Sequence, residues 1–462
     1  MVLAFYYIWF GEDGSRWKVS ADKPTMGAYV STDAHVVREH CRMAKEAGID
    51  GFIVSLWQEE VFGGINRARQ ITEILEECGL KYTFYVENGD VVERVKEILR
   101  VFGERRNLLR VGGKPLIFIY SRINPQLVDV KRRLKLQSLS DVAVISLHDF
   151  NGLNGFTSGS MHTYIDFKND GEYFREMCDY THAFGGLCAV PVSPGFNLKT
   201  RPKAKVPRRG GETYLSQWRR ALYSGADIVL ITSFNEWEEG TQIEPSESYG
   251  SHYLNLTRMM AERFKAAVRG PLRSTFSPPK VRTSKSVCYM PARAPRSPTY
   301  LVLPGRELSS GQYPSGCDVV IYDFGEKYFP NDVYVLLRYV RRGGTLLLAG
   351  GPFPMYRKGG GKAEPAVGRF GLRIGFGPDL RGKYRTASVK GRYRTYRYYA
   401  VGETRLRTLE NPDVSLYGLY LAGKPLGTVV GERGFGGGKV MYLWRGVGEQ
   451  PYLPEILREI LR

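Results

Sequence analysis

Four glutamates follow a single apolar run closely enough to act on one substrate. The segment ADIVLITSFNEWEEGTQIEP (226–245) is typical of a buried strand that ends in a group of carboxylates: Glu236, Glu238, Glu239 and Glu244. Carboxylates that share a site repel one another's charge, which raises the pKa of at least one of them and suits it to general-acid catalysis. An exposed acidic loop is the alternative interpretation.

An amide and an indole interleaved with these carboxylates favour a site over an acidic loop. Asn235 can make two hydrogen bonds to a polar ligand, and Trp237 can offer a flat apolar face, as a sugar ring requires. Glu236 and Glu239 are three residues apart, so on one helical turn their Cβ atoms would lie about 5–6 Å apart on one side. We therefore expect the catalytic carboxylates among these four glutamates.

Aromatic and polar residues also mark the ends of other apolar runs. Each one alone is more often packing or capping, but together they outline one cleft that is rich in carboxylates and aromatic rings. His148 and Asp149 end a fifth run and belong to the same pattern. The predicted substrate contacts are Tyr6, Trp9, Trp57, Glu87, Tyr120, Asn235 and Trp237.

Alternating strands and helices must position these residues. Near-continuous apolar runs indicate strands of a buried parallel sheet. Eight of them with intervening helices predict a (β/α)8 TIM barrel over residues 1–270, with an open doubly wound sheet as the alternative. The expected strands are 3–10, 50–57, 81–87, 115–120, 142–148, 156–165, 186–193 and 226–234. The expected helices are 33–48, 66–79, 90–102, 168–184, 212–224 and 250–267.

The remainder of the chain predicts a linker and a second α/β domain. Residues 271–297 are basic and rich in Pro and Ser, which is typical of a linker. Residues 298–462 predict a smaller flavodoxin-like domain, similar to class I glutamine amidotransferases, in which YLVLP (300–304) is the first strand. No His follows His252, which excludes Cys–His amidotransferase chemistry there, so we expect an accessory role.

The positive charge is concentrated in the C-terminal part. The net charge is +19, and residues 1–270 hold 35 basic and 33 acidic residues, against 31 and 14 in residues 271–462. The charge predicts either an anionic partner or a solvated Arg-rich surface. No nucleic-acid motif accompanies it, so we do not expect a nucleic-acid partner. The second domain is a candidate for homo-oligomer contacts.

The six cysteines and the N-terminus bear on the compartment. No CxxC occurs, so we expect neither a disulfide framework nor a zinc site, and a mostly reduced protein. The dispersed histidines predict no metal, and no motif implies a cofactor. MVLAFYYIWFG lacks a basic n-region and a cleavage site, and no apolar run is long enough to span a membrane. We expect a cytoplasmic protein, or a secreted one if the sequence is a mature form.

Several of these motifs, in this order, resemble glycoside hydrolase family 99, the endo-α-mannosidase and endo-α-mannanase family. The resemblance covers roughly residues 3–267. The family commonly has His where this chain has Glu238, and Tyr where it has Phe196. The segments that carry the resemblance are FYYIWFG (5–11), residues 27–57, VGGKPLIFIY (111–120), SPGFNLKTRP (193–202), GGETYLSQW (210–218) and SFNEWEEGTQIEP (233–245).

The resemblance implies a retaining, endo-acting hydrolase of α-mannosidic linkages in an oligo- or polysaccharide. Glu236 would act as the base on the sugar 2-hydroxyl, and Glu239 as the general acid/base on the glycosidic oxygen, through a 1,2-anhydro sugar. Two alternatives remain open. One is a carbohydrate-active barrel of different chemistry, such as an α-glucanase or a polysaccharide-assembly protein. The other is a non-enzymatic binder of an anionic polymer through the basic C-terminal domain.

Overall fold

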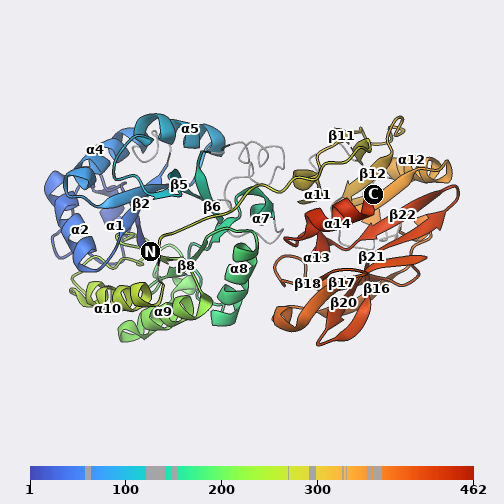
Figure 1. Cartoon of the computed structure of the whole chain (residues 1–462). Helices are drawn as coiled ribbons and strands as arrows, with labels where there is room; N and C mark the ends of the chain where they lie inside the picture. The colour runs from blue at the N-terminus through green and yellow to red at the C-terminus, as the bar shows by residue number, and fades with distance from the viewer. Residues whose placement is uncertain are drawn as a thin grey trace. The chain divides into compact units, whose positions relative to one another are not determined.

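The computed structural model of the chain divides into two units. The first, here called the barrel unit, ends at Phe276, and the second unit begins at Ser277 and also includes helix α7 (Leu153–Thr157). Figure 1 shows the chain from the blue N-terminus to the red C-terminus. The structure describes residues 1–57, 64–120, 139, 141–147, 153–268, 270–290, 298–324, 327–328, 330–350, 356–357 and 367–462.

The barrel unit is a closed parallel barrel. Eight strands among the described residues run in the order β3-β2-β1-β9-β8-β7-β6-β5, and pairing of β3 with β5 closes the ring. This confirms the predicted (β/α)8 barrel. The strands are β1 (Val2–Tyr6), β2 (Gly51–Leu56), β3 (Lys81–Val86), β5 (Lys114–Ile119), β6 (Ala143–Leu147), β7 (Ser160–His162), β8 (Cys188–Val192) and β9 (Ile228–Ile231), with β4 (Arg110–Val111) antiparallel to β5.

Helices surround these strands (Figure 1), and local capping fixes where several begin. The Asp33 carboxylate accepts the backbone N–H of His35, and Asp90 accepts those of Val92 and Glu93, as N-cap residues do. No helix among the described residues is long and apolar enough to cross a membrane. The helices are α1 (Ser15–Val19), α2 (Ala34–Glu46), α4 (Gly64–Glu77), α5 (Val91–Phe102), α8 (Gly171–Ala183), α9 (Glu212–Ser224) and α10 (His252–Ala267), with short 3₁₀ turns at Pro202–Ala204 and Arg209–Gly211.

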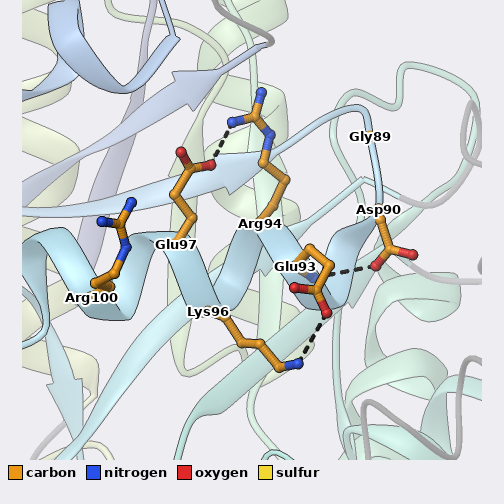
Figure 2. A pocket seen from close by; sticks show the side chains of 7 residues that line it. All are labelled: Gly89, Asp90, Glu93, Arg94, Lys96, Glu97 and Arg100. Carbon is orange, nitrogen blue, oxygen red and sulfur yellow. Dashed lines mark hydrogen bonds and ion pairs between the residues drawn. The ribbon is translucent and has the colours of Figure 1, made fainter.

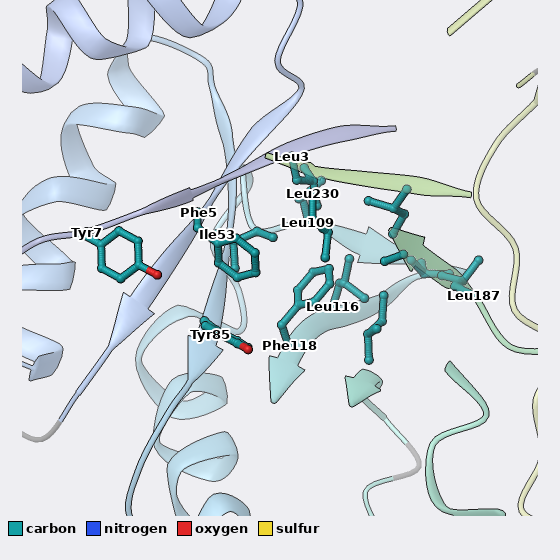
Figure 3. Close-up of a cluster of buried hydrophobic side chains, with 14 residues drawn as sticks. Leu3, Phe5, Tyr7, Ile53, Tyr85, Leu109, Leu116, Phe118, Leu187 and Leu230 are labelled. Atoms are coloured by element: carbon teal, nitrogen blue, oxygen red, sulfur yellow. The ribbon is translucent and has the colours of Figure 1, made fainter. Parts of the chain in front are cut away.

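Side-chain alternation fills the interior of the barrel. Successive residues of a strand point to opposite faces, so every second side chain enters the barrel. Phe5 and Tyr7 from the first strand and its end meet Ile53, Tyr85 and Phe118 there, as Figure 3 shows. The polar residues described below lie at the carboxyl end of this packed interior.

The second unit contains a large mixed sheet. Five parallel strands have the order β11-β10-β12-β14-β22, which is 2-1-3-4-5 along the chain, a common order of doubly wound sheets. Antiparallel strands extend the sheet beyond β22. The flavodoxin-like assignment of the domain stays a prediction. The parallel strands are β10 (Val287–Met290), β11 (Arg306–Glu307), β12 (Val319–Phe324), β14 (Thr345–Gly350) and β22 (Gly438–Leu443).

The remaining elements of the second unit are short helices and an antiparallel extension. The additional strands are β16 (Ile374–Asp379), β17 (Ala387–Gly391), β18 (Thr395–Arg397), β19 (Arg405–Leu409), β20 (Val414–Leu421) and β21 (Lys424–Phe435), with the separate pair β13 (Lys327–Tyr328) and β15 (Tyr356–Arg357). The helices are α11 (Pro298–Val302), α12 (Pro330–Arg341), α13 (Arg445–Gly448) and α14 (Leu453–Ile460), with 3₁₀ turns at Val367–Phe370 and Tyr384–Thr386.

The start of the second unit differs from the prediction. The apolar run at 300–304 was expected to be a strand, but residues 298–302 form helix α11. The first strand is β10, which lies inside the segment that was expected to be only a linker. Four apolar residues in a Pro- and Ser-rich stretch carry too little periodicity to reveal a strand. Pro298 starts the helix because its fixed φ suits a first helical position.

The cysteines also differ from the prediction, because all six are paired. Cys41 bonds Cys78, Cys178 bonds Cys188 and Cys288 bonds Cys317, with Cα atoms 6.7, 5.1 and 5.9 Å apart. The expectation of free, reduced cysteines is therefore wrong. Cysteine usage therefore does not favour a reducing compartment.

Candidate active site

The carboxyl ends of the barrel strands bring together residues that are far apart in the sequence. Tyr7, Trp57, Glu87 and Tyr120 each follow directly after a strand, and Glu236 lies a few residues past β9. In a parallel barrel these positions meet at one end, which is where barrel enzymes carry their active sites.

The loop after β9 is folded by its own hydrogen bonds. The backbone N–H of Ser233 donates to the carbonyl of Thr241 (2.9 Å), and that of Ile243 donates back to Ser233 (3.0 Å). The Glu236 carboxylate accepts the backbone N–H groups of Glu238 (3.0 Å) and Glu239 (3.4 Å). The spacing of three thus places both predicted catalytic carboxylates on one turn.

Arg208 holds the other side of this loop. Its guanidinium donates to the carbonyl oxygens of Gly240 (3.0 Å) and Gln242 (2.8 Å). It also lies 4.6 and 4.4 Å from the ring centroids of Tyr249 and Tyr253. Burial of Arg208 lowers its pKa, so the two carbonyl acceptors and the aromatic faces replace the water that the cation has lost.

Burial and crowding raise the pKa values of the carboxyl groups in the site. Burial is the largest cause for Glu236, whose pKa is held well above its usual range, and the charges of Glu239 and Glu238 add to it. Burial raises the pKa of Glu239 to about 7, and burial together with Glu239 raises that of Glu87 to about 7. Near neutral pH the pair Glu236 and Glu239 therefore retains a proton, so it can supply both an acid and a base.

Two tyrosines link these carboxylates. The Tyr164 hydroxyl donates to Glu239 Oε2 (3.1 Å), and its oxygen lies 2.5 Å from that of Tyr7. Burial raises the pKa of Tyr7 well above its usual range, and Glu87, Glu236 and Glu239 all add to the shift. All three carboxylates therefore surround this hydroxyl pair. Sequence reasoning missed Tyr164 as a site residue. It lies two residues past the three-residue strand β7, inside the expected strand 156–165.

Glu238 also has a partner that the sequence did not reveal. Arg16 Nη1 lies 2.7 Å from Glu238 Oε1, and the Arg16 guanidinium lies 5.3 Å from the centroid of the Trp9 ring. Both charged side chains remain partly exposed, 29% for Arg16 and 17% for Glu238. The pair therefore lies at the rim of the site.

Three of the predicted aromatic contacts lie where a sugar could reach them. Trp9, Trp57 and Tyr120 are half-buried at the strand ends, and Trp9 and Tyr120 pack against the barrel interior. The Trp9 and Trp57 ring centroids are 6.4 Å apart. Glu87 is buried beside them and accepts a hydrogen bond from Ser55. His148 and Asp149 lie outside the residues that the structure describes.

The predicted sugar contacts Tyr6 and Trp237 need correction, because both side chains are fully buried in the protein. Tyr6 points toward the helices, where its hydroxyl lies 2.9 Å from His40 Nδ1. The Trp237 ring is fully buried and donates its Nε1–H to Glu244 Oε2 (3.1 Å). Neither ring can stack on a sugar, because protein atoms cover both. Glu244, bonded as well to His40 (2.9 Å), belongs to this packing.

Asn235 is buried as well, and its amide is used by the protein. Its Oδ1 accepts the backbone N–H of Tyr7 (2.7 Å), and its Nδ2 donates to the Tyr7 carbonyl (2.9 Å). The bidentate amide predicted for a sugar instead ties the loop after β9 to the end of β1. Asn235 therefore positions Tyr7 and Glu236 relative to each other.

A shallow depression on helix α5 is a weaker candidate for a site. Its lining charges are already matched, since Arg94 pairs with Glu97 (2.6 Å) and Lys96 with Glu93 (3.0 Å), as Figure 2 shows. Such ion pairs on an exposed helix are ordinary surface features.

A closed parallel barrel with crowded, buried carboxylates at its strand ends defines the protein as a (β/α)8 protein with the site of a glycoside hydrolase. The chain belongs to glycosyl hydrolase family 99. The model of that family matches residues 14–153 and 130–260, which together span more than half of the chain.

Individual relatives agree with this family. The chain is 27% identical over 302 residues to a human "Glycoprotein endo-alpha-1,2-mannosidase-like protein" (52% of this chain, 64% of the relative). It is 26% identical over 305 residues to a mouse "Glycoprotein endo-alpha-1,2-mannosidase" (52% and 63%). The match therefore spans somewhat less than two thirds of these relatives.

A solved structure supports the fold. The GH99 endo-alpha-mannosidase from Bacteroides thetaiotaomicron matches with a TM-score of 0.52 at 23% identity, over 58% of this chain and 98% of that one.

Proposed function

We propose that the protein is a retaining, endo-acting glycoside hydrolase that cleaves α-mannosidic linkages in a glycan. The observation that carries this proposal is the carboxylate pair Glu236 and Glu239 on one turn at the barrel's carboxyl end. Family membership and the endo-α-1,2-mannosidase for which the mouse relative is named support it.

Glu239 suits the general acid and Glu236 the base. Burial leaves Glu239 with a pKa of about 7, so a substantial fraction carries a proton near neutral pH. Burial, with the charges of Glu239 and Glu238, also raises the pKa of Glu236, so the free pair shares a proton. Two backbone N–H groups donate to Glu236 and oppose this shift, because they favour its ionised form. The assignment of Glu236 as the base therefore follows the resemblance to the family and not its pKa.

The first step forms a 1,2-anhydro sugar. Glu236 accepts the proton of the mannose 2-hydroxyl while O2 forms a bond to C1. The bond from C1 to the glycosidic oxygen breaks, and Glu239 gives its proton to that oxygen. Glu239 then takes a proton from water and the water oxygen bonds to C1 while the C1–O2 bond breaks, and O2 recovers the proton from Glu236. Two inversions at C1 give net retention.

This route depends on the configuration of the sugar. In an α-mannoside the 2-hydroxyl and the leaving group are trans, so O2 can attack C1 from behind. In an α-glucoside the 2-hydroxyl is cis to the leaving group, which closes the route. The usual retaining mechanism forms a glycosyl ester on a carboxylate about 5–5.5 Å from the acid. The two mechanisms therefore differ in what they require of the substrate.

Hydrolysis of a panel of α-mannans and α-glucans by the full chain tests the proposal. We expect cleavage of α-mannan. NMR should show that the new reducing end is first released as the α-anomer. Glu236→Gln and Glu239→Gln should each lose about 10²–10⁴-fold in kcat. Glu247→Gln, an exposed glutamate just beyond the same loop, is the matched control.

A substrate without the 2-hydroxyl distinguishes the 1,2-anhydro mechanism from the glycosyl-ester mechanism. A 2-deoxymannose residue at the cleavage position should bind but not turn over. A trapped glycosyl ester on Glu236 would instead show that the Glu236 carboxylate itself attacks C1. Cleavage of α-glucan alone, or near-normal rates in both Gln variants, would reject the proposal.

A further inference from the structure

The second unit contains a segment in which positive charge and tyrosines alternate without any acidic residue. Residues 380–402 contain seven basic residues, five tyrosines and no Asp or Glu. The run lies on the outer edge of the sheet, where β17 and β18 form a hairpin. The basic residues are Arg381, Lys383, Arg385, Lys390, Arg392, Arg394 and Arg397.

The strand register separates an inner and an outer side of this hairpin. Val389 and Tyr396 are cross-strand partners, and Tyr396 stacks on Tyr452 with ring centroids 4.3 Å apart. These two side chains therefore face the helix that carries Tyr452. Lys390, the next residue of β17, points to the opposite side, because side chains alternate along a strand.

Aromatic rings accompany the cations on this outer side and at the turn. Lys390 Nζ lies 4.6 Å from the centroid of the Tyr420 ring, and Arg392 lies 5.2 Å from that of Tyr393. Tyr393 is 78% exposed, the most exposed large hydrophobic side chain among the residues that the structure describes. We call Lys390, Arg392, Tyr393 and Tyr420 the hairpin face. Arg394 lies on the inner side, where its Nη1 donates to the Tyr396 hydroxyl (3.4 Å).

The charge of the hairpin face is not neutralised within the described part of the chain. No described carboxylate forms an ion pair with Lys390, Arg392 or Arg394. Elsewhere in the same unit, Lys439 pairs with Glu432 at 2.8 Å and Arg433 with Asp413 at 3.2 Å. The hairpin face thus leaves two neighbouring cations, Lys390 and Arg392, for an external anion.

We propose that the hairpin face binds an acidic polysaccharide, with its cations on the acidic groups and the Tyr393 ring on a sugar face. Charge complementarity requires an anionic partner, because a solvated cation cluster attracts polyanions along their length. The exposed ring offers an apolar surface with a polar edge. The attached barrel belongs to a glycan-cleaving family, which favours a glycan over a nucleic acid as the partner.

A protective role for the charges is the alternative to a binding site. Lys and Arg on an edge strand keep it from pairing with other chains. That role does not require an exposed tyrosine, and it predicts aggregation rather than lost binding when the charges are removed. The experiment below therefore records both.

Binding by the full chain is measured by titration calorimetry with polygalacturonate, a neutral α-mannan and a single-stranded oligo-dT, at several salt concentrations. The test variant is K390Q/R392Q, and Y393A is measured separately. The control variant R338Q/R341Q removes the same charge from α12, which packs on β14 and β22 at the other part of the sheet (Figure 1). Thermal melting and light scattering check that each variant folds and stays dispersed.

We expect the native chain to bind polygalacturonate with an affinity that falls as salt rises, and to prefer it to oligo-dT. Any binding of the neutral α-mannan by the barrel should not change in the hairpin variant. The hairpin variant should lose about tenfold or more in affinity and flatten the salt dependence, Y393A should lose severalfold, and the α12 variant about twofold or less. Equal losses in the two double variants would overturn the proposal, because they would show attraction to the overall charge. Preferred binding of oligo-dT, no binding of polygalacturonate, or aggregation of the hairpin variant with unchanged binding would overturn it as well. Because binding needs no turnover, these outcomes are independent of whether the barrel cleaves α-mannan.

Discussion

Arg16 Nη1 lies 2.7 Å from Glu238 Oε1, so the carboxylate between the two proposed catalytic glutamates is paired with a cation from a short helix more than 200 residues earlier. The charge of Glu238 raises the pKa of both Glu236 and Glu239. Arg16 therefore partly offsets a like charge at the place where the proton of the reaction is held. The Arg16 guanidinium also covers one face of the Trp9 ring, so the ion pair lies beside this aromatic side chain.

Removal of Arg16 should shift the pH dependence of activity. In Arg16→Gln the Glu238 charge acts on the catalytic pair without its partner, so the pKa values of the pair rise. The whole rate–pH profile should move to higher pH by about half a unit to one unit. Glu238→Gln removes the like charge and should move the profile to lower pH.

The double variant is the control for the Arg16 prediction. In Arg16→Gln/Glu238→Gln both charges are absent, so the profile should return close to that of the native chain. Arg16→Lys keeps the charge and should keep the native profile. Equal shifts in the same direction for both single variants would show that the pair acts through packing and not through charge.

Tyr164→Phe should slow turnover by about tenfold with little change in KM. The variant loses the hydrogen bond to Glu239, which orients this carboxyl and holds its pKa down. The profile should therefore also move to higher pH. Tyr7→Phe keeps the Tyr164 bond to Glu239 and should have a smaller effect on the profile. An unchanged profile with a raised KM would instead assign Tyr164 to ground-state substrate binding.

The barrel could be predicted from the sequence because its signals are local. Most strands are short apolar runs and most helices have their own period and caps, so these boundaries agree within a few residues. The expected strand 156–165 is the exception, because helix α7 ends at Thr157 and β7 covers only Ser160–His162. The orientation of single side chains is less well determined. Tyr6 and Tyr7 are adjacent, and the alternation of the strand sends Tyr6 to the helices and Tyr7 into the site. A shift of one residue in register exchanges the two roles.

The rest of the site depends on contacts between distant segments. Arg16 meets Glu238, Tyr164 meets Glu239, and His40 meets Glu244, and no spacing in the sequence encodes these pairs. Trp237 was expected to bind sugar because it lies among glutamates, but the loop turns its ring into the core. The disulfides join residues 37, 10 and 29 positions apart without any motif, so their pairing could not be derived from the sequence.

Thiol titration should find no free cysteine in the protein unfolded without reductant, and six after reduction. Each disulfide closes a loop that restricts the unfolded chain, which stabilises the fold by up to about 3–4 kcal/mol. Reductant should therefore lower the melting temperature of the native chain. Cys41→Ser should leave one free thiol, at Cys78, which is the control for pairing. Six free thiols without reductant would contradict the three bonds.

Glu239→Gln should make the protein more stable at alkaline pH while it removes activity. Burial raises the pKa of Glu239 from 4.5 to about 7, so the folded state favours the protonated form. The stability from this group is fully present below about pH 4.5 and is lost as pH rises through 7. Gln resembles the protonated carboxyl and does not ionise. The variant should gain about 1–3 kcal/mol, or a few degrees in melting temperature, at pH 8.5, and almost nothing at pH 4.5. The exposed Glu247→Gln should show neither effect, and an equal gain at both pH values would show that the ionisation of Glu239 is not the cause.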